Sequence, residues 1–558
     1  MPIDFAFAPY RLTPGVLPED AARLASELEA DPLLAALADP LPVGLLSRAL
    51  ADLPAGRAPS QEDACRAADG SPSGLSGLPR ACLSSARHRE RVSQAAREAL
   101  STGFGGVCLD RPDSSLALGL LGAGFCPECQ GAFSRHLSRE YGEHFQPVDY
   151  LAMAREAVTV SSGALTFAEL PFGRDFWRFR VEALDEAVQV YVRGARDGAR
   201  GLDRPFEVVA QFEALGPGQV RAARHLDGAV FPGPETAGTG IGHFRLLRAV
   251  MGRRPVAIAP PPAASATPAQ ISRLSAVAAT CGIELSGLGP TGPSGAVFSP
   301  VRRLARQLAR QAGRPPAQAT PVAEACILYS LEADLWTNGR HHASVARAGE
   351  ALASVHFQSP VVTRVHDVPP EAALILADAV ALPAHEAKEV RRRLEAGTAV
   401  LSFGEPGQVD EGGRPFGSFL PGGKAGGVKV GSGTLAELPS LSPEKGSPEA
   451  IEPAVLEKAL AALVGRGRRA AGVSGRSPLL VVLQRSGEAL DVHLVSLGQE
   501  RAQGVTLFLS SQVAGGVRRG RFVSSDGTDV RIPLNPSGYS LSTVLPSFEG
   551  YAVLSLAT

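Results

Sequence analysis

Four acidic residues follow short apolar runs in the first half of the chain, where they could carry out nucleophilic or proton-transfer chemistry. Asp110 ends one such run and Asp113 stands three residues later. Glu213 directly follows a second run, and Glu235 follows a third after a Pro-Gly-Pro turn. Hydrolysis of a glycosidic bond needs two carboxylic groups, one to protonate the leaving oxygen and one to attack the sugar or activate water.

Asp110 is the first candidate for such chemistry, because active sites of parallel barrels lie at the carboxyl ends of their strands. The competing interpretation is a helix cap or an ion pair with the neighbouring Arg111. Glu235 and Glu213 are the candidates for its partner, and each could equally be a solvent-facing loop acid. Asp113 is a competing candidate for the catalytic role of Asp110. If it does not have that role, it is a candidate for substrate binding.

Two cysteines, Cys126 and Cys129, form a Cys-x-x-Cys pair. A zinc site needs four ligands, at least three of them from the protein, so Cys82, Cys108 or His136 would have to complete it. The alternative is a pair of reduced cysteines without a metal. A redox role is disfavoured because the pair lacks a matching βαβ context.

The first 300 residues alternate apolar runs with amphipathic stretches, a pattern typical of parallel β pairing. Repeated over this length, it predicts a (β/α)8 TIM barrel at 1–312 rather than an open sheet. The second strand, within 40–70, is obscure. The expected strands are 3–9, 81–84, 105–110, 207–212, 228–232, 255–259 and 282–287, and the expected helices are 88–101, 128–141, 175–199, 242–252 and 268–281.

Two further segments follow the predicted barrel. Buried strands and helices over 320–420 predict a small α/β domain of flavodoxin or amidotransferase type with a parallel sheet. Residues 404–450 are rich in Gly, Ser, Pro and Glu and predict a long loop, and 421–470 is expected to be a linker with a helix at 453–465. Short strands separated by turns at 471–558 predict an antiparallel β-sandwich.

Composition and charge argue against several classes of partner. The formal net charge of 558 residues is -1, which gives no global field for nucleic acid or anionic lipid. No apolar run reaches the length of a membrane span, and the first residues lack the pattern of a signal peptide. The seven cysteines are sparse and odd in number, so reduced thiols in a cytoplasmic protein are expected.

Three segments in order resemble one known architecture. Residues 103–110, the Cys126–Cys129 motif and Tyr141-Gly142 resemble the fourth-strand region of glycoside hydrolase family 42 β-galactosidases and related hypothetical glycosyl hydrolases. Residues 373–413 resemble the β-galactosidase trimerisation domain of that family, and 491–495 lie in a similar C-terminal sandwich. The resemblance implies a glycoside hydrolase with a carbohydrate substrate, no organic cofactor, a structural zinc, and a homo-oligomer, dimer or trimer.

The chain departs from that family at three places. The seventh-strand segment 255–261 contains no acid, the usual Asn-Glu pair of the fourth strand is Leu109-Asp110, and one family cysteine is replaced by Gly124. Barrels of the α-fucosidase type, which use a fourth-strand Asp as nucleophile, fit better. Asp110 would then attack, with Glu235 or Glu213 as the acid/base.

Aromatic residues, on which sugar rings usually rest, are scarce in the barrel half. The candidates for substrate contacts, besides Asp113, are Phe212, Phe231, His243 and Trp177, although Trp177 also suits a helix core. A catalytically inactive carbohydrate-binding or assembly protein on the same scaffold therefore stays open as the alternative function.

Overall fold

The computed structural model describes residues 11–12, 50–58, 60–75, 78–101, 106–116, 118–119, 121–142, 145–160, 170–202, 206–234, 239–259, 268–285, 319–416, 419–420, 427–441, 453–464, 469–498 and 500–556. These residues form two compact units. The first takes the described residues up to Pro232 together with Arg254–Ala259, and the second takes nearly all of the rest.

A parallel sheet forms the centre of the first unit. Its strands pair in chain order, each parallel to the next, as a (β/α) repeat requires. In β5 and β6 the register joins Asp110 to Gln211, so the carboxyl ends of these two strands meet at the same edge. The strands are β1 (Arg11–Leu12), β2 (Leu50–Leu53), β5 (Gly106–Asp110), β6 (Glu207–Gln211), β7 (Gly228–Pro232) and β8 (Val256–Ala259).

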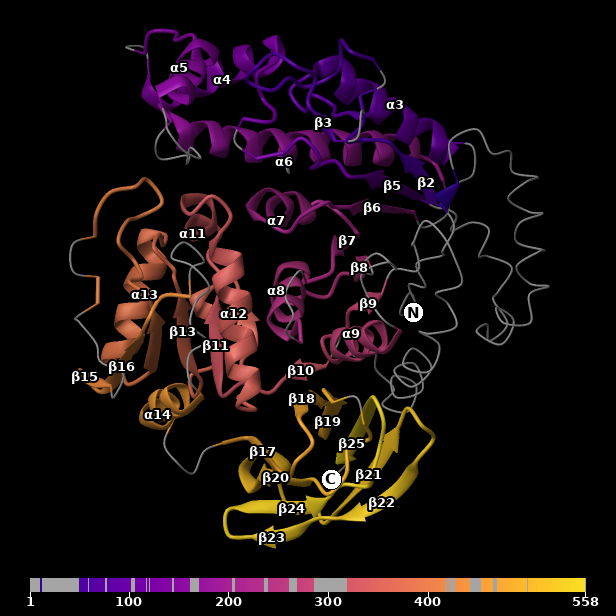
Figure 1. Ribbon diagram of the computed structural model, residues 1–558, viewed down its shortest axis with the longest axis vertical. Helices are drawn as coiled ribbons and strands as arrows, with labels where there is room; N and C mark the ends of the chain where they lie inside the picture. Colours follow the sequence, from indigo (N-terminus) through magenta and orange to yellow (C-terminus); the bar gives the residue numbers. More distant parts are fainter. Residues whose placement is uncertain are drawn as a thin grey trace, which may run out of the picture. The chain divides into compact units, whose positions relative to one another are not determined.

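Five helices accompany this sheet, and α3 and α6 lie side by side along it (Figure 1). The apolar positions of α6 recur at helical spacing and are buried, among them Phe176, Leu184 and Tyr191. The helices expected at 88–101, 128–141 and 175–199 are confirmed within two residues at each end. The five are α3 (Ala86–Ser101), α4 (Pro127–Tyr141), α5 (Tyr150–Val160), α6 (Gly173–Gly198) and α7 (Pro217–Ala223).

The strand expected at 81–84 is wrong. Strand β2 pairs directly with β5, so no strand enters the sheet between them. Ala81 instead makes an isolated bridge to Ala64, and Cys82 is buried beside other cysteines, which explains why the segment is apolar without being a strand. The obscure second strand is β2, and the strand expected at 3–9 lies outside the described residues. A short hairpin, β3 (Gly74–Leu75) and β4 (Leu78–Pro79), lies in this connection.

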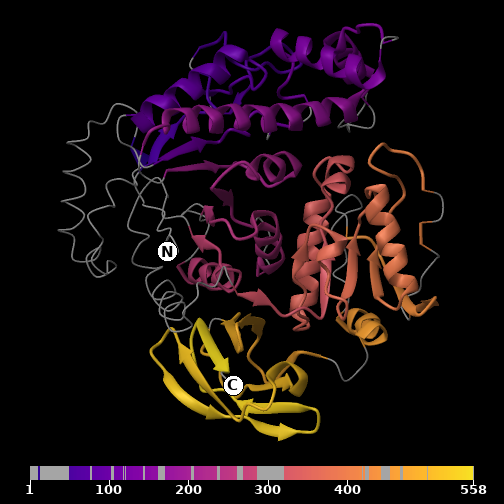
Figure 2. The same ribbon diagram turned by 180° about the vertical axis from the view of Figure 1, so that it is seen from behind.

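The second unit contains α8 (Ile241–Met251), α9 (Pro268–Thr280), the short β9 (Glu284–Leu285), and a mixed sheet in the order β12-β11-β13-β14-β16-β15. Helices α12 and α13 lie on opposite sides of this sheet (Figure 2). The elements are β11 (Ala325–Leu328), α11 (Leu331–Trp336), α12 (His341–Ser354), β12 (Val361–Val362), η3 (Val365–Asp367), β13 (Ala373–Ala377), α13 (Ala384–Glu395), β14 (Ala399–Phe403), β15 (Val428–Val430), β16 (Gly433–Leu438) and α14 (Pro453–Val464).

The loop predicted at 404–450 contains regular structure. Strand β16 adds parallel to β14 and β15 pairs antiparallel with β16, so the sheet continues to Leu438. The prediction failed because β15 has only three residues and glycines lie at or beside the ends of both strands, among them Gly427, Gly431 and Gly433.

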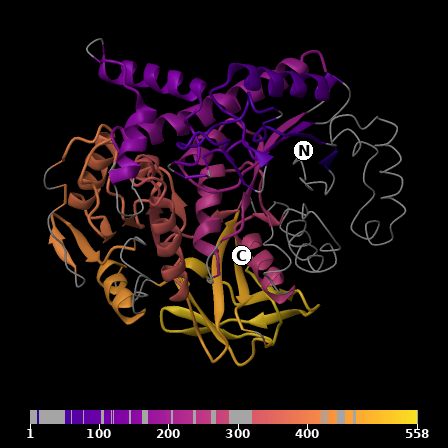
Figure 3. The ribbon, with the colours of Figure 1, turned by 45° about the horizontal axis from the view of Figure 1, so that its top comes forward.

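The C-terminal strands (orange to yellow in Figure 3), together with β10, form a six-stranded and a four-stranded sheet that share one apolar core. Neighbouring strands within each of these sheets pair antiparallel. The strands are β10 (Thr320–Pro321), β17 (Ala471–Ser474), β18 (Leu479–Ser486), β19 (Ala489–Ser496), β20 (Thr506–Ser510), β21 (Arg519–Ser524), β22 (Asp529–Pro533), β23 (Asn535–Ser537), β24 (Ser540–Val544) and β25 (Tyr551–Leu556), with α15 (Ser511–Ala514) after β20. None of the helices in the described part of the chain has the length and hydrophobicity to span a membrane.

Candidate active site

Asp110 ends β5, and the loop after β2 closes tightly over the backbone that follows it. The amide of Gly56 donates to the Asp110 carbonyl at 3.0 Å, and the Ser114 hydroxyl donates to the Gly56 carbonyl at 2.7 Å. A Cβ on Gly56 would stand 1.8 Å from the carbonyl oxygen of Arg111, so only glycine fits this approach. Arg111 itself adopts φ +48°, an uncommon conformation for a residue with a side chain, and its amide donates to Gln211 at 2.8 Å.

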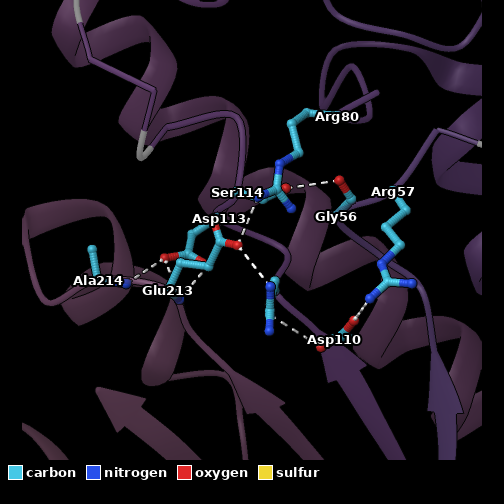
Figure 4. Close-up of polar contacts among 9 residues, drawn as sticks. Gly56, Arg57, Arg80, Asp110, Asp113, Ser114, Glu213 and Ala214 are labelled. Carbon is cyan, nitrogen blue, oxygen red and sulfur yellow. Dashed lines mark hydrogen bonds and ion pairs between the residues drawn. The ribbon is translucent and has the colours of Figure 1, made fainter. Parts of the chain in front are cut away.

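Three arginines converge on two carboxylates at this edge of the sheet (Figure 4). Arg57 Nη2 lies 3.6 Å from Asp110 Oδ2, and Arg111 Nε lies 3.7 Å from Asp110 Oδ1. Glu213 Oε1 accepts from Arg80 Nη2 at 2.9 Å and from Arg111 Nη1 at 3.2 Å. One guanidinium group, that of Arg111, therefore contacts both candidate acids, which brings Asp110 and Glu213 into one site.

Asp113 lies beneath this cluster and is fully buried. Its carboxylate accepts from the backbone amides of Glu213 and Ala214 at 3.0–3.1 Å and from Gln219 Nε2 at 2.8 Å. Burial raises the pKa of Asp113 to about 6, although these hydrogen bonds lower it. The predicted substrate contact is therefore wrong for Asp113, because its oxygens are occupied and shielded from solvent. Its observed contacts hold the chain that carries Glu213.

The remaining candidates for substrate contacts are mostly buried. Phe212 and Phe231 are at most 2% exposed and pack against each other with ring centroids 5.1 Å apart, so they belong to the core and not to a substrate surface. Trp177 is 8% exposed on α6, as expected of a core residue. His243 is partly buried on α8 in the second unit, with its ring beside that of the next residue. Glu235 lies outside the described residues.

Four cysteines of the first unit converge in a buried cluster. Cys82 Sγ lies 3.2 Å from Cys126 Sγ and 3.4 Å from Cys129 Sγ, and Cys65 Sγ lies 4.0 Å from Cys129 Sγ. The amide of Gly124 donates to Cys65 Sγ at 3.0 Å. Cys82 was one of the expected additional members. Cys108 packs in the sheet core instead, and His136 pairs with Glu182.

The spacing of these sulfurs fits a metal ion. Four thiolates at about 2.3 Å from a tetrahedral zinc ion stand about 3.8 Å from one another. Cys65, Cys126 and Cys129 have their sulfurs within 4.8 Å of one another, and all four cysteines are at most 5% exposed. Hydrogen bonds within the cluster, first those with Cys126, lower the pKa of Cys65 well below its usual range and raise the pKa of Cys82 and Cys129. Three sulfurs, with that of Cys82 beside two of them, therefore offer a donor set that suits a zinc ion.

A buried arginine connects the cysteine cluster to the loop after β5. The Arg180 side chain donates to the carbonyls of Ser115 and Gly119, and it lines a small cavity together with Cys65 and Cys129. The residue is fully buried, and burial lowers its pKa whereas the two thiols raise it. The segment that carries Asp113 is thus held in part by a cation next to the sulfurs.

Sequence reasoning missed Arg57, Arg80 and Cys65. All three lie in the irregular connection after β2, where no periodic pattern indicates which side chains point toward β5. The one available signal was the presence of two further cysteines, Cys65 and Cys82, in this connection. Their spacing to Cys126 does not follow a known motif.

Comparisons with known proteins define the fold. No family model matches the chain, and no curated protein matches its sequence. Among solved structures, Gan42B, a GH42 β-galactosidase from G. stearothermophilus, superposes with a TM-score of 0.62 at 13% identity, covering 92% of this chain and 88% of that chain. A β-galactosidase from the haloarchaeon Halorubrum lacusprofundi gives 0.59 at 13% identity, covering 98% of each chain. The α-L-fucosidase isoenzyme 2 from Paenibacillus thiaminolyticus gives 0.58 at 13% identity, covering 91% and 87%.

These similarities extend over nearly the whole of each chain. The chain therefore has the mixed α/β fold of GH42 β-galactosidases, with a β-rich C-terminal region, and the predicted resemblance is confirmed at the level of the fold. Because a fold hosts many functions, the activity has to be argued from the site.

Proposed function

We propose that the protein is a glycoside hydrolase in which Asp110 attacks the anomeric carbon of the sugar. The observation that carries this proposal is that Asp110 and Glu213 end up in one site, at the carboxyl ends of neighbouring parallel strands, joined through Arg111. The fold shared with β-galactosidases and an α-L-fucosidase supports the same reaction class. We propose that the parallel strands of the first unit belong to a (β/α)8 barrel that the chain completes.

In this reaction Glu213 protonates the leaving oxygen and then removes a proton from the water that releases the sugar from Asp110. Glu235 stays an alternative acid/base. Asp113 acts as a positioning residue, because it fixes the backbone amides of Glu213 and Ala214. The guanidinium groups stabilise the negative charge of Asp110 before attack.

A panel of aryl α- and β-glycosides, including galactosides and fucosides, tests this function. Asp110→Asn should abolish turnover while leaving the melting temperature near that of the wild type. Asp491→Asn is a matched control, because this partly buried aspartate lies on β19 in the second unit. Full activity of Asp110→Asn would refute the proposal. An inactive wild type that still bound oligosaccharide would favour the carbohydrate-binding alternative.

We also propose that Cys65, Cys82, Cys126 and Cys129 bind one structural zinc ion. Their sulfur separations, their burial and their all-thiolate character support it. Elemental analysis of the purified protein should find about one zinc per chain, and Cys65→Ser should lower this content. Cys108→Ala, a buried cysteine outside the cluster, should retain the metal. Zinc-free wild-type protein would refute this proposal.

We propose, on the resemblance alone, that the α/β sheet of the second unit contributes to a homo-oligomer, a dimer or trimer. Light scattering coupled to size exclusion measures the mass directly. A monomer at micromolar concentration would contradict this expectation.

A further inference from the structure

The arginines around Asp110 and Glu213 outnumber the acids that they contact. Arg57, Arg80 and Arg111 contact only these two carboxylates among the described side chains at this edge. A third acid, Asp113, is fully buried, and its oxygens accept hydrogen bonds from amide groups behind the site. Among the described side chains at this edge, three guanidinium groups therefore face two accessible carboxylates, in a chain whose formal net charge is -1.

Two of these guanidinium groups are open to solvent. The side chains of Arg57 and Arg111 are 49% and 41% exposed, whereas that of Asp110 is 7% exposed. Both contacts to Asp110, at 3.6 and 3.7 Å, are longer than a hydrogen bond. Since a guanidinium group carries five N–H donors, Arg57 and Arg111 keep donors to offer to a solute.

The third guanidinium group, that of Arg80, is buried. Arg80 is 7% exposed, and its Nε has no hydrogen-bond partner among the described residues. Its backbone pairs with that of Arg57 in an isolated antiparallel bridge. The backbone of Arg111 adopts φ +48° and packs closely against Gly56. The backbone of each arginine is thus held in place by contacts with the rest of this edge.

We infer that the site takes an anionic sugar, whose carboxylate or sulfate group is bound by Arg57 and Arg111. This inference rests on the proposed glycosidase function and specifies its substrate class. Guanidinium groups bind planar carboxylates and sulfate oxygens through paired hydrogen bonds, and these bonds are stronger than those to neutral hydroxyls. An anion at this position would also compete with Glu213 for Arg111 and leave Arg80 as the one guanidinium partner of that acid among the described side chains.

Matched pairs of substrates test the inference. The kcat/KM of aryl galacturonide and aryl galactose 6-sulfate is compared with that of aryl galactoside, and aryl glucuronide with aryl glucoside. The wild type should prefer the anionic member of a pair by at least about 10-fold, the effect of one charged hydrogen bond. The uronide and sulfate arms distinguish the two sources of negative charge.

The variant Arg57→Gln should reduce the ratio of anionic to neutral kcat/KM by about 10–100-fold, mainly through KM. Arg87→Gln is the control, because this exposed arginine pairs with Glu62 away from the site and should leave the ratio unchanged. Equal turnover of both members of each pair, or an equal loss for both in Arg57→Gln, would overturn the inference and leave the glycosidase proposal intact.

If no glycoside is turned over, the glycosidase proposal fails and binding decides the inference. Calorimetry with galacturonate, galactose 6-sulfate and galactose then gives the affinities directly. Tighter binding of an anionic sugar that is lost in Arg57→Gln would support the charge assignment, and equal affinity for all three sugars would refute it.

Discussion

The buried carboxyl of Asp113 makes stability depend on pH in a way that can be calculated. Burial raises the pKa of Asp113 from 3.8 to about 6 in the folded protein. Between these values the folded protein keeps the proton and the unfolded chain loses it. The stabilisation is therefore complete below pH 3.8 and is lost as the pH rises through 6, because the folded state binds more protons than the unfolded state.

The size of this effect follows from the two pKa values. At 1.36 kcal/mol per pH unit, the full difference is about 3 kcal/mol. The loss is already about 1 kcal/mol at about pH 4.5 and is nearly complete at about pH 7.5, so about 2 kcal/mol changes between these two conditions. Because Asp113 is fully buried, solvent screens this charge little.

Asp113→Asn isolates this contribution from the titration of every other group. The amide keeps one oxygen to accept from Ala214 and Gln219, and it does not titrate. Denaturant unfolding of both proteins is measured between about pH 4.5 and 7.5, and the free energy of unfolding of the wild type should fall relative to the variant by about 2 kcal/mol over this range. A difference that stayed constant with pH, or that rose with pH, would refute the assignment of a protonated, buried carboxyl.

Two further perturbations test the surroundings of the site. Gly56→Ala should cost about 1–3 kcal/mol and reduce turnover, because the added Cβ meets the Arg111 carbonyl, whereas Gly472→Ala, with nothing within 4 Å, should leave both stability and turnover near wild type. Equal effects of the two substitutions would contradict the close packing at Gly56. Cys65→Ser should speed hydrogen exchange of the backbone at 113–116, because Arg180 holds that loop next to the sulfurs. If exchange there is unchanged in a zinc-depleted protein, the metal does not stabilise the loop.

The sequence predicted the parts of the fold that follow a simple period. The helix α6 and the strands β5 to β8 have long or continuous apolar patterns, and their positions are confirmed within a residue or two. The segment 81–84 looked like a strand because it is apolar, but its burial comes from contact with Ala64 and the cysteine cluster. Short apolar runs do not distinguish these two kinds of burial.

The candidate site was predictable only where a residue ends a regular element. Asp110 and Glu213 follow strands, so their common edge could be expected from parallel pairing. Arg57 and Arg80 lie in an irregular connection, and their positions depend on tertiary contacts such as that of Gly56 with Arg111. Phe212 and Phe231 were candidates for substrate contacts because they lie near strand ends, but both side chains are buried in the core.

The role of Asp110 as the attacking group is tested most directly by trapping the covalent intermediate. The protein is incubated with a 2-deoxy-2-fluoro aryl glycoside of the best substrate, digested, and analysed by mass spectrometry. We expect the fluorosugar mass on the peptide that contains Asp110, and no label in Asp110→Asn. A label on Glu213 or on another acid, or turnover without any labelled peptide, would contradict the account.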